Sequence, residues 1–435
     1  MGSLGVINTD PAIKNLVEFA FKNEGKGAYE LKFFCQREEI LDFFSYNIPE
    51  VVIINFSDPH INIEYICNHI RDDRWILNFG IVGLFSQERH NEEGLLEKYK
   101  AINVLNMLET SRIRSHLVKS VQIIERNYQI IFQREFTRNL MDGASGSFII
   151  GNDLLAVPLY ASIGATILAQ RGLITPDNKM HLQLALGELI VNAVEHGNCG
   201  ITYDEKTIGM DKGLSVVDLV AEKCKDPAIR AKKVDFQWEI RAEKSLFTIH
   251  DEGKGFDVKA HLKKVATQDM LSLHGRGIKL ASMLSQELIY NERGNQVTLC
   301  IKHDSMVEHE VPIGFSKEQV VIVKKGDIVL REGEPSDFLY YISSGKYSVF
   351  HNSKQVGILS PQDIFMGEMS FLLNQKRSAS VRAETHGKLI LLQRKNFVNV
   401  IREHPHYGLF LCKVLARRLV RSNDQNAALI TKYKS

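Results

Sequence analysis

The sequence predicts a multidomain protein, with two successive α/β units followed by a β-roll and a C-terminal helix. Residues 1–122 alternate short β-rich runs with helical stretches of about ten residues, which is typical of a parallel sheet covered on both faces. A second α/β pattern occupies residues 148–303. From about residue 320, short strands alternate with turns rich in Gly, Pro and Asp, as in a β-roll or barrel. A final helix is expected from about His406 onward.

Composition limits the class of protein. The chain has 435 residues, which favours about three domains. It carries 54 Lys and Arg residues against 52 Asp and Glu, so no overall basic excess points to a nucleic-acid binder. The six cysteines are scattered without a CxxC pair, which is typical of reduced thiols in the cytoplasm. We therefore expect a cytoplasmic protein that binds no DNA directly.

Neither the N-terminus nor the most apolar run predicts a membrane protein. The opening residues MGSLGVINTD lack a basic region followed by an apolar core, so a secretory signal is not expected. The run from Leu154 to Ala169 is 16 residues long and contains Pro158, whereas a bilayer span needs about 20 apolar residues. We expect this run to form a buried helix and the protein to make no membrane contact.

Two linkers are expected between the three units. The charged, periodic segment from about Thr110 to Leu140 predicts a connecting helix or a coiled-coil joint. The Gly/Ser-rich sequence MDGASGS at 141–147 is typical of a boundary. The expected division is a domain at 1–122, a helical linker at 123–147, a domain at 148–303, a linker at 304–317, and a domain with its C-terminal helix at 318–435.

The first unit resembles a known family through its polar residues. Asp10 follows the first expected strand, and VVIINFSDP spans the end of the third; this pattern resembles the receiver domain of response regulators. Receivers use an Asp at the end of strand three as the phosphate acceptor, and this sequence has Asn55 there. Their Mg²⁺-binding acidic pair after strand one is reduced here to Asn8, Thr9 and Asp10. Because a carboxamide is a poor nucleophile, we expect a pseudo-receiver used for docking or dimerisation. Asp58 remains an alternative acceptor, although an Asp before a Pro commonly forms a turn.

In the second unit, separated motifs predict one nucleotide site. Glu188 and Asn192 are four residues apart, so they share one face of an expected helix. A carboxamide oxygen can ligate Mg²⁺ while the neighbouring carboxylate accepts a proton. Asp251 ends an expected strand before Gly253 and Gly255. At such a turn the backbone can approach a flat base, and the carboxylate can accept a hydrogen bond from an exocyclic amine.

A third motif follows in LHGRGIKLASML. Gly275 and Gly277 flank Arg276 at the start of an expected helix, and free amides at a helix N-terminus bind phosphate. The three motifs, in this order, resemble the N, G1 and G2 boxes of the GHKL (Bergerat-fold) ATP-binding superfamily. Within it, ELIVNAVEHGN resembles the anti-sigma-factor serine kinase branch. The resemblance implies an α/β sandwich of the Bergerat type that binds ATP and Mg²⁺.

The same resemblance implies a role for each matching residue. Glu188 matches the general base, Asn192 the Mg²⁺ ligand and Asp251 the residue that recognises adenine. The glycines that would frame the ATP lid are Gly253, Gly255, Gly275 and Gly277. The cations that could meet a γ-phosphate are Lys259, Lys263, Lys264 and Arg276, and the sequence does not choose among them.

Other features of the second unit have two readings. The charged insertion from Cys199 to about Lys233 is a partner-docking element or a surface excursion. His196, beside Glu195, is more readily a loop-anchoring residue than a catalytic one. Upstream of this unit, His116 lacks the following acidic residue and Pro of a phosphoaccepting histidine, which disfavours autophosphorylation on His.

The third unit contains a second ligand motif, DIFMGEMSFLLNQKRSASVRAET. Gly367 and Glu368 precede a short expected helix, and Arg377, Ser378 and Ala379 follow it. Binding a cyclic nucleotide requires one fixed guanidinium and helix-start amides for the phosphate, and a carboxylate that accepts a hydrogen bond from the ribose hydroxyl. This spacing resembles the phosphate-binding cassette of cyclic nucleotide-binding domains. The resemblance implies that Glu368 binds the ribose and Arg377 the phosphate of cAMP or cGMP, with Ser378 assisting.

Together these motifs predict a cytoplasmic signalling protein. The expected function is a serine/threonine protein kinase of the anti-sigma-factor type, regulated by a cyclic nucleotide and acting on a partner such as an anti-anti-sigma factor. One alternative is an ATPase that acts as a conformational switch, because GHKL relatives also use the Glu to activate water. The other is a non-enzymatic scaffold. Homodimerisation is left open. About a dozen residues follow the last expected helix, too few for a DNA-binding domain.

Overall fold

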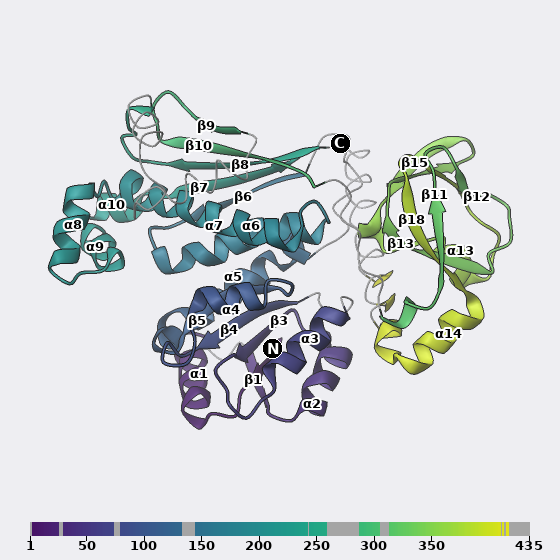
Figure 1. Ribbon diagram of the computed structural model, residues 1–435, viewed down its shortest axis with the longest axis horizontal. Helices are drawn as coiled ribbons and strands as arrows, with labels where there is room; N and C mark the ends of the chain where they lie inside the picture. Colours follow the sequence, from purple (N-terminus) through teal and green to yellow (C-terminus); the bar gives the residue numbers. More distant parts are fainter. Residues whose placement is uncertain are drawn as a thin grey trace, which may run out of the picture.

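The computed structural model arranges the described residues in three parts (Figure 1). No helix in those parts is both long enough and apolar enough for a membrane span. The described residues are 2–25, 29–73, 79–132, 144–241, 243–258, 287–304, 313–409, 411, 412, 415 and 416.

The N-terminal unit is a parallel sheet with helices on both faces, as the sequence predicts. The strands lie in the order β2-β1-β3-β4-β5, and all four pairings are parallel. Every residue of β3 and β4 is buried, which explains why both read as continuous apolar runs. The elements are β1 (Gly2–Ile7), α1 (Pro11–Asn23), β2 (Tyr29–Phe34), α2 (Arg37–Asp42), β3 (Val51–Asn55), α3 (Ile63–Asp72), β4 (Gly80–Phe85), α4 (Glu92–Lys98), β5 (Val104–Glu109) and α5 (Ile113–Phe132).

Helix α5 differs from the connecting helix or coiled-coil joint that its charge pattern predicts. It contacts α1 and the strands β3, β4 and β5 on one side and α6 on another. The predicted linker at 123–147 therefore does not form one free element: its beginning is the end of α5, residues 133–143 lie outside the described part, and residues 144–147 open a strand. The buried apolar residues of α5 are Ile113, Leu117, Val118, Val121, Ile123, Ile124, Tyr128, Ile131 and Phe132.

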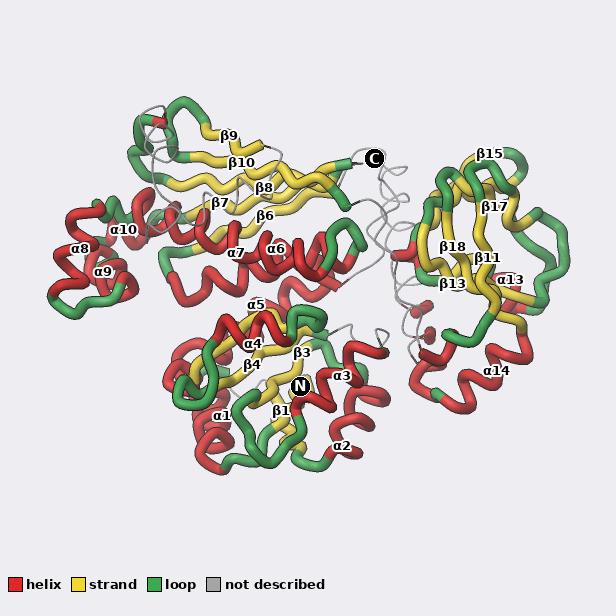
Figure 2. Tube along the Cα trace, viewed as in Figure 1, coloured by secondary structure: helices red, strands yellow, loops and turns green. Residues whose placement is uncertain are grey.

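The central unit is an antiparallel sheet with two long helices on one face (Figure 2). Its strand order is β6-β7-β8-β10-β9, and β7 and β8 alternate buried with more exposed residues, as expected for a sheet with one covered face. The elements are β6 (Ala144–Ile150), α6 (Val157–Gln170), α7 (Pro176–Asn192), the π-helical turn η5 (Ala193–Asn198), α8 (Tyr203–Asp211), α9 (Val216–Lys223), α10 (Pro227–Ala231), β7 (Val234–Ile240), β8 (Lys244–Asp251), β9 (Glu287–Tyr290) and β10 (Gln296–Lys302).

Of two sequence features in this unit, the first differs from the prediction and the second agrees with it. Part of the Gly/Ser-rich boundary MDGASGS belongs to β6 rather than to a turn. Gly146 lies against the indole of Trp238, where a Cβ would come within 2.6 Å of the ring, so packing explains this glycine. The apolar run from Leu154 to Ala169 forms a short turn and then α6, which is almost wholly buried, as the sequence predicts.

The N-terminal and central units share one hydrophobic core. Helix α6 contacts both α5 and β5, and Figure 2 shows α6 and α7 between the central sheet and the N-terminal unit. Buried residues from both sheets and from the helices between them form a single cluster. Burial on this scale is the main favourable term in folding, so the two units are expected to move together.

The C-terminal unit is the predicted β-roll, built from two antiparallel sheets of order β11-β18-β13-β16 and β12-β17-β14-β15. Two boundaries differ from expectation: the helical region begins at Arg394 and is interrupted at His404, and Phe315, within the predicted linker, is buried in this unit's core. The elements are β11 (Gln319–Val323), β12 (Ile328–Leu330), β13 (Phe338–Ser344), β14 (Tyr347–His351), β15 (Lys354–Leu359), β16 (Phe365–Met366), α13 (Glu368–Leu373), β17 (Ser380–Ala383), β18 (Gly387–Gln393) and α14 (Arg394–Glu403).

Candidate functional site

Helix α7 carries the predicted base and metal ligand. It begins with Thr175, whose Oγ1 accepts a hydrogen bond from the backbone N–H of Asn178 at 3.3 Å, and Pro176 is its first residue, both typical of a helix start. Its buried side chains join the hydrophobic core and the helix packs along α6, which leaves Glu188 exposed and Asn192 half-buried at the end. Within the described part of the chain, neither side chain has a hydrogen bond or ion pair, so both remain available to a ligand.

Asp251 lies at the end of β8, where the residue is 8% exposed. Its Oδ1 accepts a hydrogen bond from the Gly253 N–H at 2.8 Å. Asn295 holds the backbone on both sides: the Asp251 N–H donates to its carbonyl at 3.0 Å, and its Nδ2 donates to the Asp251 carbonyl at 2.9 Å. Burial raises the pKa of Asp251. The carboxylate is thus oriented and desolvated, which suits a residue that reads one hydrogen-bond donor on a ligand.

The structure brings Asp251 against the end of the helix that carries Glu188 and Asn192. A Cβ at Gly197 would lie 2.3 Å from Cγ of Asp251, and a Cβ at Gly253 would lie 2.3 Å from the Gly197 carbonyl oxygen. Only glycine fits such a close approach of two backbone segments. The two motifs, more than 50 residues apart in sequence, therefore form one surface. Gly255 has a φ of +78°, the left-handed conformation that favours glycine.

Sequence reasoning missed Asn198, the residue that joins these segments. Its side chain is 1% exposed. Its Oδ1 accepts a hydrogen bond from the Glu252 N–H at 2.9 Å, and its Nδ2 donates to Asn152 Oδ1 at 2.9 Å. The available signal was its place at the end of ELIVNAVEHGN. Its partners, however, are 54 and 46 residues away in the chain, so the motif alone could not name them.

The insertion between the motifs folds into α8, α9 and α10 and is fastened to η5. Lys206 of α8 lies 2.8 Å from Oε1 of the buried Glu195, and Lys232 Nζ donates to the Asn198 carbonyl at 3.0 Å. Nδ1 of His196 lies 2.6 Å from the Ile201 carbonyl oxygen, a loop-anchoring contact as expected. These contacts fix the insertion and the following loop to η5, next to Asp251.

The predicted lid falls outside the described residues. This applies to the third motif and to all the cations proposed for a γ-phosphate, so their placement stays a prediction. The residues concerned are Lys259, Lys263, Lys264, Gly275, Arg276 and Gly277.

In the C-terminal unit, Arg377 is 3% exposed and holds the predicted cassette together. Its Nη1 donates to the Gly367 carbonyl at 2.9 Å and to Ser370 Oγ at 3.1 Å, and its Nη2 donates to the Phe338 carbonyl. Burial lowers the pKa of this guanidinium. Its Nε is buried without a hydrogen-bond partner among the described residues, so the guanidinium retains a donor.

The other cassette residues surround this guanidinium differently. Gly367 has a φ of +81°, and a Cβ there would lie 2.5 Å from Arg377 Nη1, so a larger residue would displace the guanidinium. Glu368 is half-buried and is the first residue of α13 rather than a residue preceding it. Ser378 is exposed and Ala379 half-buried. The structure therefore brings Gly367, Glu368 and Arg377 together at the start of α13.

The polar residues of the N-terminal unit satisfy one another. Asn55 Nδ2 donates to Asn8 Oδ1 at 2.8 Å. Asp58 Oδ1 accepts hydrogen bonds from Thr9 Oγ1 at 2.7 Å and from the His60 N–H at 3.0 Å, and Oδ2 accepts from the Thr9 N–H at 2.5 Å. Burial acts to raise the pKa of Asp58, but these hydrogen bonds outweigh it and lower the pKa. The Asp58 carboxylate therefore links the loop after β1 to the loop after β3.

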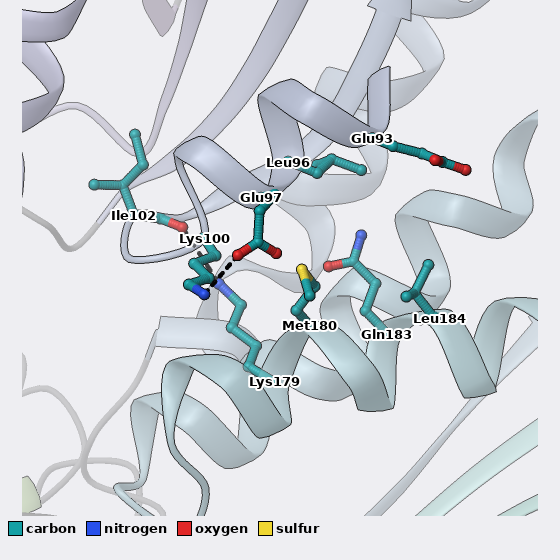
Figure 3. Close-up of a pocket in the computed structure, with 9 residues that line it drawn as sticks. All are labelled: Glu93, Leu96, Glu97, Lys100, Ile102, Lys179, Met180, Gln183 and Leu184. Carbon is teal, nitrogen blue, oxygen red and sulfur yellow. Dashed lines mark hydrogen bonds and ion pairs between the residues drawn. The ribbon is translucent and has the colours of Figure 1, made fainter. Parts of the chain in front are cut away.

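A cavity of about 320 Å³ opens between α4 and α7 (Figure 3). Lys100 Nζ, at one end, lies 2.7 Å from Glu97 Oε1 and 2.6 Å from Asp177 Oδ1. No predicted site residue lines the cavity, so it is separate from both candidate nucleotide sites. Its lining residues are Glu93, Leu96, Glu97, Lys100, Ile102, Lys179, Met180, Gln183 and Leu184.

Comparison with known families agrees with the two nucleotide motifs. Residues 153–301 match the histidine kinase-like ATPase domain, and residues 320–404 match the cyclic nucleotide-binding domain. The chain carries both domains. This confirms the GHKL-type and cyclic nucleotide-binding resemblances, whereas the receiver resemblance and the anti-sigma type stay predictions.

Similar proteins match the C-terminal domain. The chain is 36% identical over 90 residues to a cGMP-dependent protein kinase of Plasmodium berghei, covering 21% of this chain and 10% of the relative. It is 37% identical over 79 residues to the cAMP-dependent protein kinase type II regulatory subunit of Drosophila melanogaster, covering 18% and 21%. The crystal structure of Thermus thermophilus catabolite activator protein is 30% identical, with a TM-score of 0.25, covering 27% of this chain and 57% of that one. The chain thus spans at most about a fifth of these curated relatives.

Proposed function

We propose that this protein is an ATP-dependent serine/threonine protein kinase of the anti-sigma-factor type whose activity is set by a cyclic nucleotide. The observation that carries the proposal is the exposed Glu188, one turn before Asn192 on α7, at the helix end that packs against Asp251. A base on an open face can reach a hydroxyl of a protein substrate, whereas a base enclosed by the chain could reach only small molecules.

The residues present suit Mg²⁺ and ATP. The close packing of Gly197 and Gly253 leaves a turn without side chains next to the oriented Asp251 carboxylate, which is the environment that a planar base requires. Asp251 would hold the adenine amine, and the carboxamide of Asn192 would ligate Mg²⁺. Bound Mg²⁺ would supply charge stabilisation to the transferring phosphate. Glu188 would accept the proton of the attacking hydroxyl.

The cyclic nucleotide would bind at the start of α13. Arg377 has an unpartnered Nε–H among the described residues and would hold the cyclic phosphate, with Glu368 accepting from the ribose hydroxyl. The relatives include a cGMP-dependent protein kinase and the regulatory subunit of a cAMP-dependent protein kinase, so the proposal takes either ligand. The favoured protein substrate is an anti-anti-sigma factor, and the N-terminal unit would serve as a pseudo-receiver for docking.

A phosphate-transfer assay tests the kinase activity. The full chain is incubated with radiolabelled ATP and Mg²⁺, with and without anti-anti-sigma candidates and with cAMP or cGMP. Glu188→Gln keeps the side-chain shape but removes the base, so transfer should fall by about 10²-fold or more while ATP binding persists. Glu239→Gln, at the far end of β7 beside Arg241, is the matched control and should transfer normally.

The products separate the alternatives. Labelled partner protein supports the kinase, and free phosphate that depends on Glu188 would replace it with an ATPase switch. If nucleotide binds but neither product forms, the protein is a scaffold whose ligands set its conformation. Normal turnover by Glu188→Gln would contradict the role of that residue in either enzyme.

A further inference from the structure

Asn198 lies where three parts of the chain meet. Its side chain bonds Glu252, next to Asp251, and Asn152, at the end of β6, while its carbonyl accepts from Lys232 behind the insertion. A residue in this position needs both a side-chain acceptor and a side-chain donor, and the Asn198 carboxamide supplies them on two separate atoms. Because Asn198 is buried, losing either bond would leave a polar group without water to replace its partner.

From Asn152 the contacts continue into the N-terminal unit. Its neighbour Asp153 accepts a hydrogen bond from Lys119 Nζ, and His116 Nε2 lies 3.7 Å from Asp153 Oδ1. Both partners belong to α5, the helix that packs on the N-terminal sheet. Asp153 Oδ1 also accepts from the Leu155 N–H at 3.1 Å, which caps the turn before α6. The backbone around Asn152 is therefore held from α5.

We propose that Asn198 is a positioning residue for the nucleotide, and that the contact of Lys119 with Asp153 sets its position from the N-terminal unit. Asn198 fixes the Glu252 amide and thereby the direction of the preceding Asp251 carboxylate. Lys119 fixes the Asn152–Asp153 corner that supports Asn198. Movement of α5 then changes how well Asp251 faces adenine, although no residue of α5 reaches the ligand. The nucleotide part of this inference rests on the proposed function.

Two measurements on the full chain test the proposal. Hydrogen exchange of the nucleotide-free protein follows the backbone amide of Glu252, and calorimetry with ADP reports binding without phosphate transfer. Asn198→Ala should speed exchange at Glu252 and weaken ADP by about 3- to 10-fold, as expected for a lost hydrogen bond. Asn198→Asp retains the acceptor for Glu252 and loses the donor to Asn152, so exchange at Glu252 should be faster than in the wild type but slower than in Asn198→Ala.

The N-terminal contribution is tested with Lys119→Met, on a half-exposed side chain whose loss leaves the core intact. This change should speed exchange at Glu252 and weaken ADP, but have no effect in the Asn198→Asp background, where the link to Asn152 is already broken. Lys14→Met, on α1 with Glu18 as its partner, is the matched control and should change neither readout.

The outcomes separate this inference from the proposed function. Unchanged exchange at Glu252 in both Asn198→Ala and Lys119→Met would overturn the inference, whether or not ADP binds. Faster exchange in a protein that binds neither ADP nor ATP would support the positioning network and refute the proposed nucleotide site. An equal effect of Lys119→Met in both backgrounds would show that α5 acts by a route other than Asn198.

Discussion

At the residue scale, the binding role proposed for Asp251 comes with a cost to stability. Burial raises its pKa, so the folded protein favours the protonated form more than the unfolded chain does. Its contribution to stability therefore declines as pH rises through the unfolded and then the folded pKa. We expect Asp251→Asn to keep or raise the unfolding temperature at neutral pH, because it removes a desolvated charge, yet to weaken ATP by about tenfold or more.

The pH dependence of binding checks the same residue. The proposed contact with adenine needs the ionised carboxylate, so ATP affinity of the wild type should fall on acidification, starting above the ordinary Asp range because the pKa of Asp251 is raised. The Asp251→Asn variant should lack this step. Calorimetric titration at several pH values with thermal unfolding of both proteins measures the two effects. Unchanged ATP affinity in the variant would reject the adenine assignment.

Arg377 is predicted to serve both the ligand and the fold. Arg377→Ala removes three hydrogen bonds to neighbouring groups, so the C-terminal domain should lose about 1–3 kcal/mol of stability. Cyclic nucleotide affinity should fall by at least about tenfold, because the phosphate loses its guanidinium. Arg382→Ala is the control, since that exposed side chain lies over the Phe350 ring. Equal ligand affinity for Arg377→Ala, measured with cAMP and cGMP on folded protein, would remove Arg377 from the site.

At the element scale, the N-terminal strand ends predict a unit that cannot be phosphorylated. Asn55 is bonded to Asn8, and both carboxylate oxygens of Asp58 accept hydrogen bonds from Thr9 or His60. The Asn55 carboxamide cannot form an acyl phosphate. Phosphorylation of Asp58 would break the hydrogen bonds that its carboxylate accepts. Acetyl phosphate should therefore leave this unit unlabelled by mass spectrometry. An acyl-phosphate label within it would contradict the prediction, and Asp58→Asn would then test the alternative acceptor.

The elements also mark how far the sequence could predict the structure. The periodicity of apolar residues and the composition of the turns predicted the parallel sheet, the buried α6 and the β-roll, because each of these depends on the spacing of residues close together in the sequence. They could not distinguish α5 from a free connecting helix, since its apolar stripe fits a coiled coil or a core equally well. Strand β6 was hidden in a Gly/Ser-rich stretch because its glycine packs under Trp238, a contact between distant residues. The same limit applies to the candidate site. Its motifs predicted Glu188 and Asp251, but the role of Asn198 depends on hydrogen-bond partners far along the chain.

At the scale of the whole molecule, the C-terminal unit contacts the N-terminal unit through a specific pair. Nε2 of His406 lies 3.0 Å from Oδ2 of the buried Asp73, just after α3. The next residue, Tyr407, is buried in the core of the β-roll, and its hydroxyl accepts from the Gly314 N–H at 3.2 Å. Since the N-terminal unit shares a core with the ATPase domain, this pair would give a route from the proposed cyclic nucleotide site to the proposed ATP site.

We therefore predict that Asp73 is required for regulation but not for binding of either nucleotide. A ligand shifts an equilibrium only if it prefers one arrangement, and a coupling of about 1–3 kcal/mol would change ATP affinity about 5- to 150-fold. Asp73→Ala should retain cyclic nucleotide binding and basal ATP binding, while the effect of saturating cAMP or cGMP on ATP affinity is lost. Asp72→Ala, its exposed neighbour paired with Arg71, should respond as the wild type does. A full response in Asp73→Ala would show that the coupling does not pass through Asp73. If the wild-type protein binds cyclic nucleotide without any change in ATP affinity or turnover, the C-terminal domain is an assembly or localisation module instead.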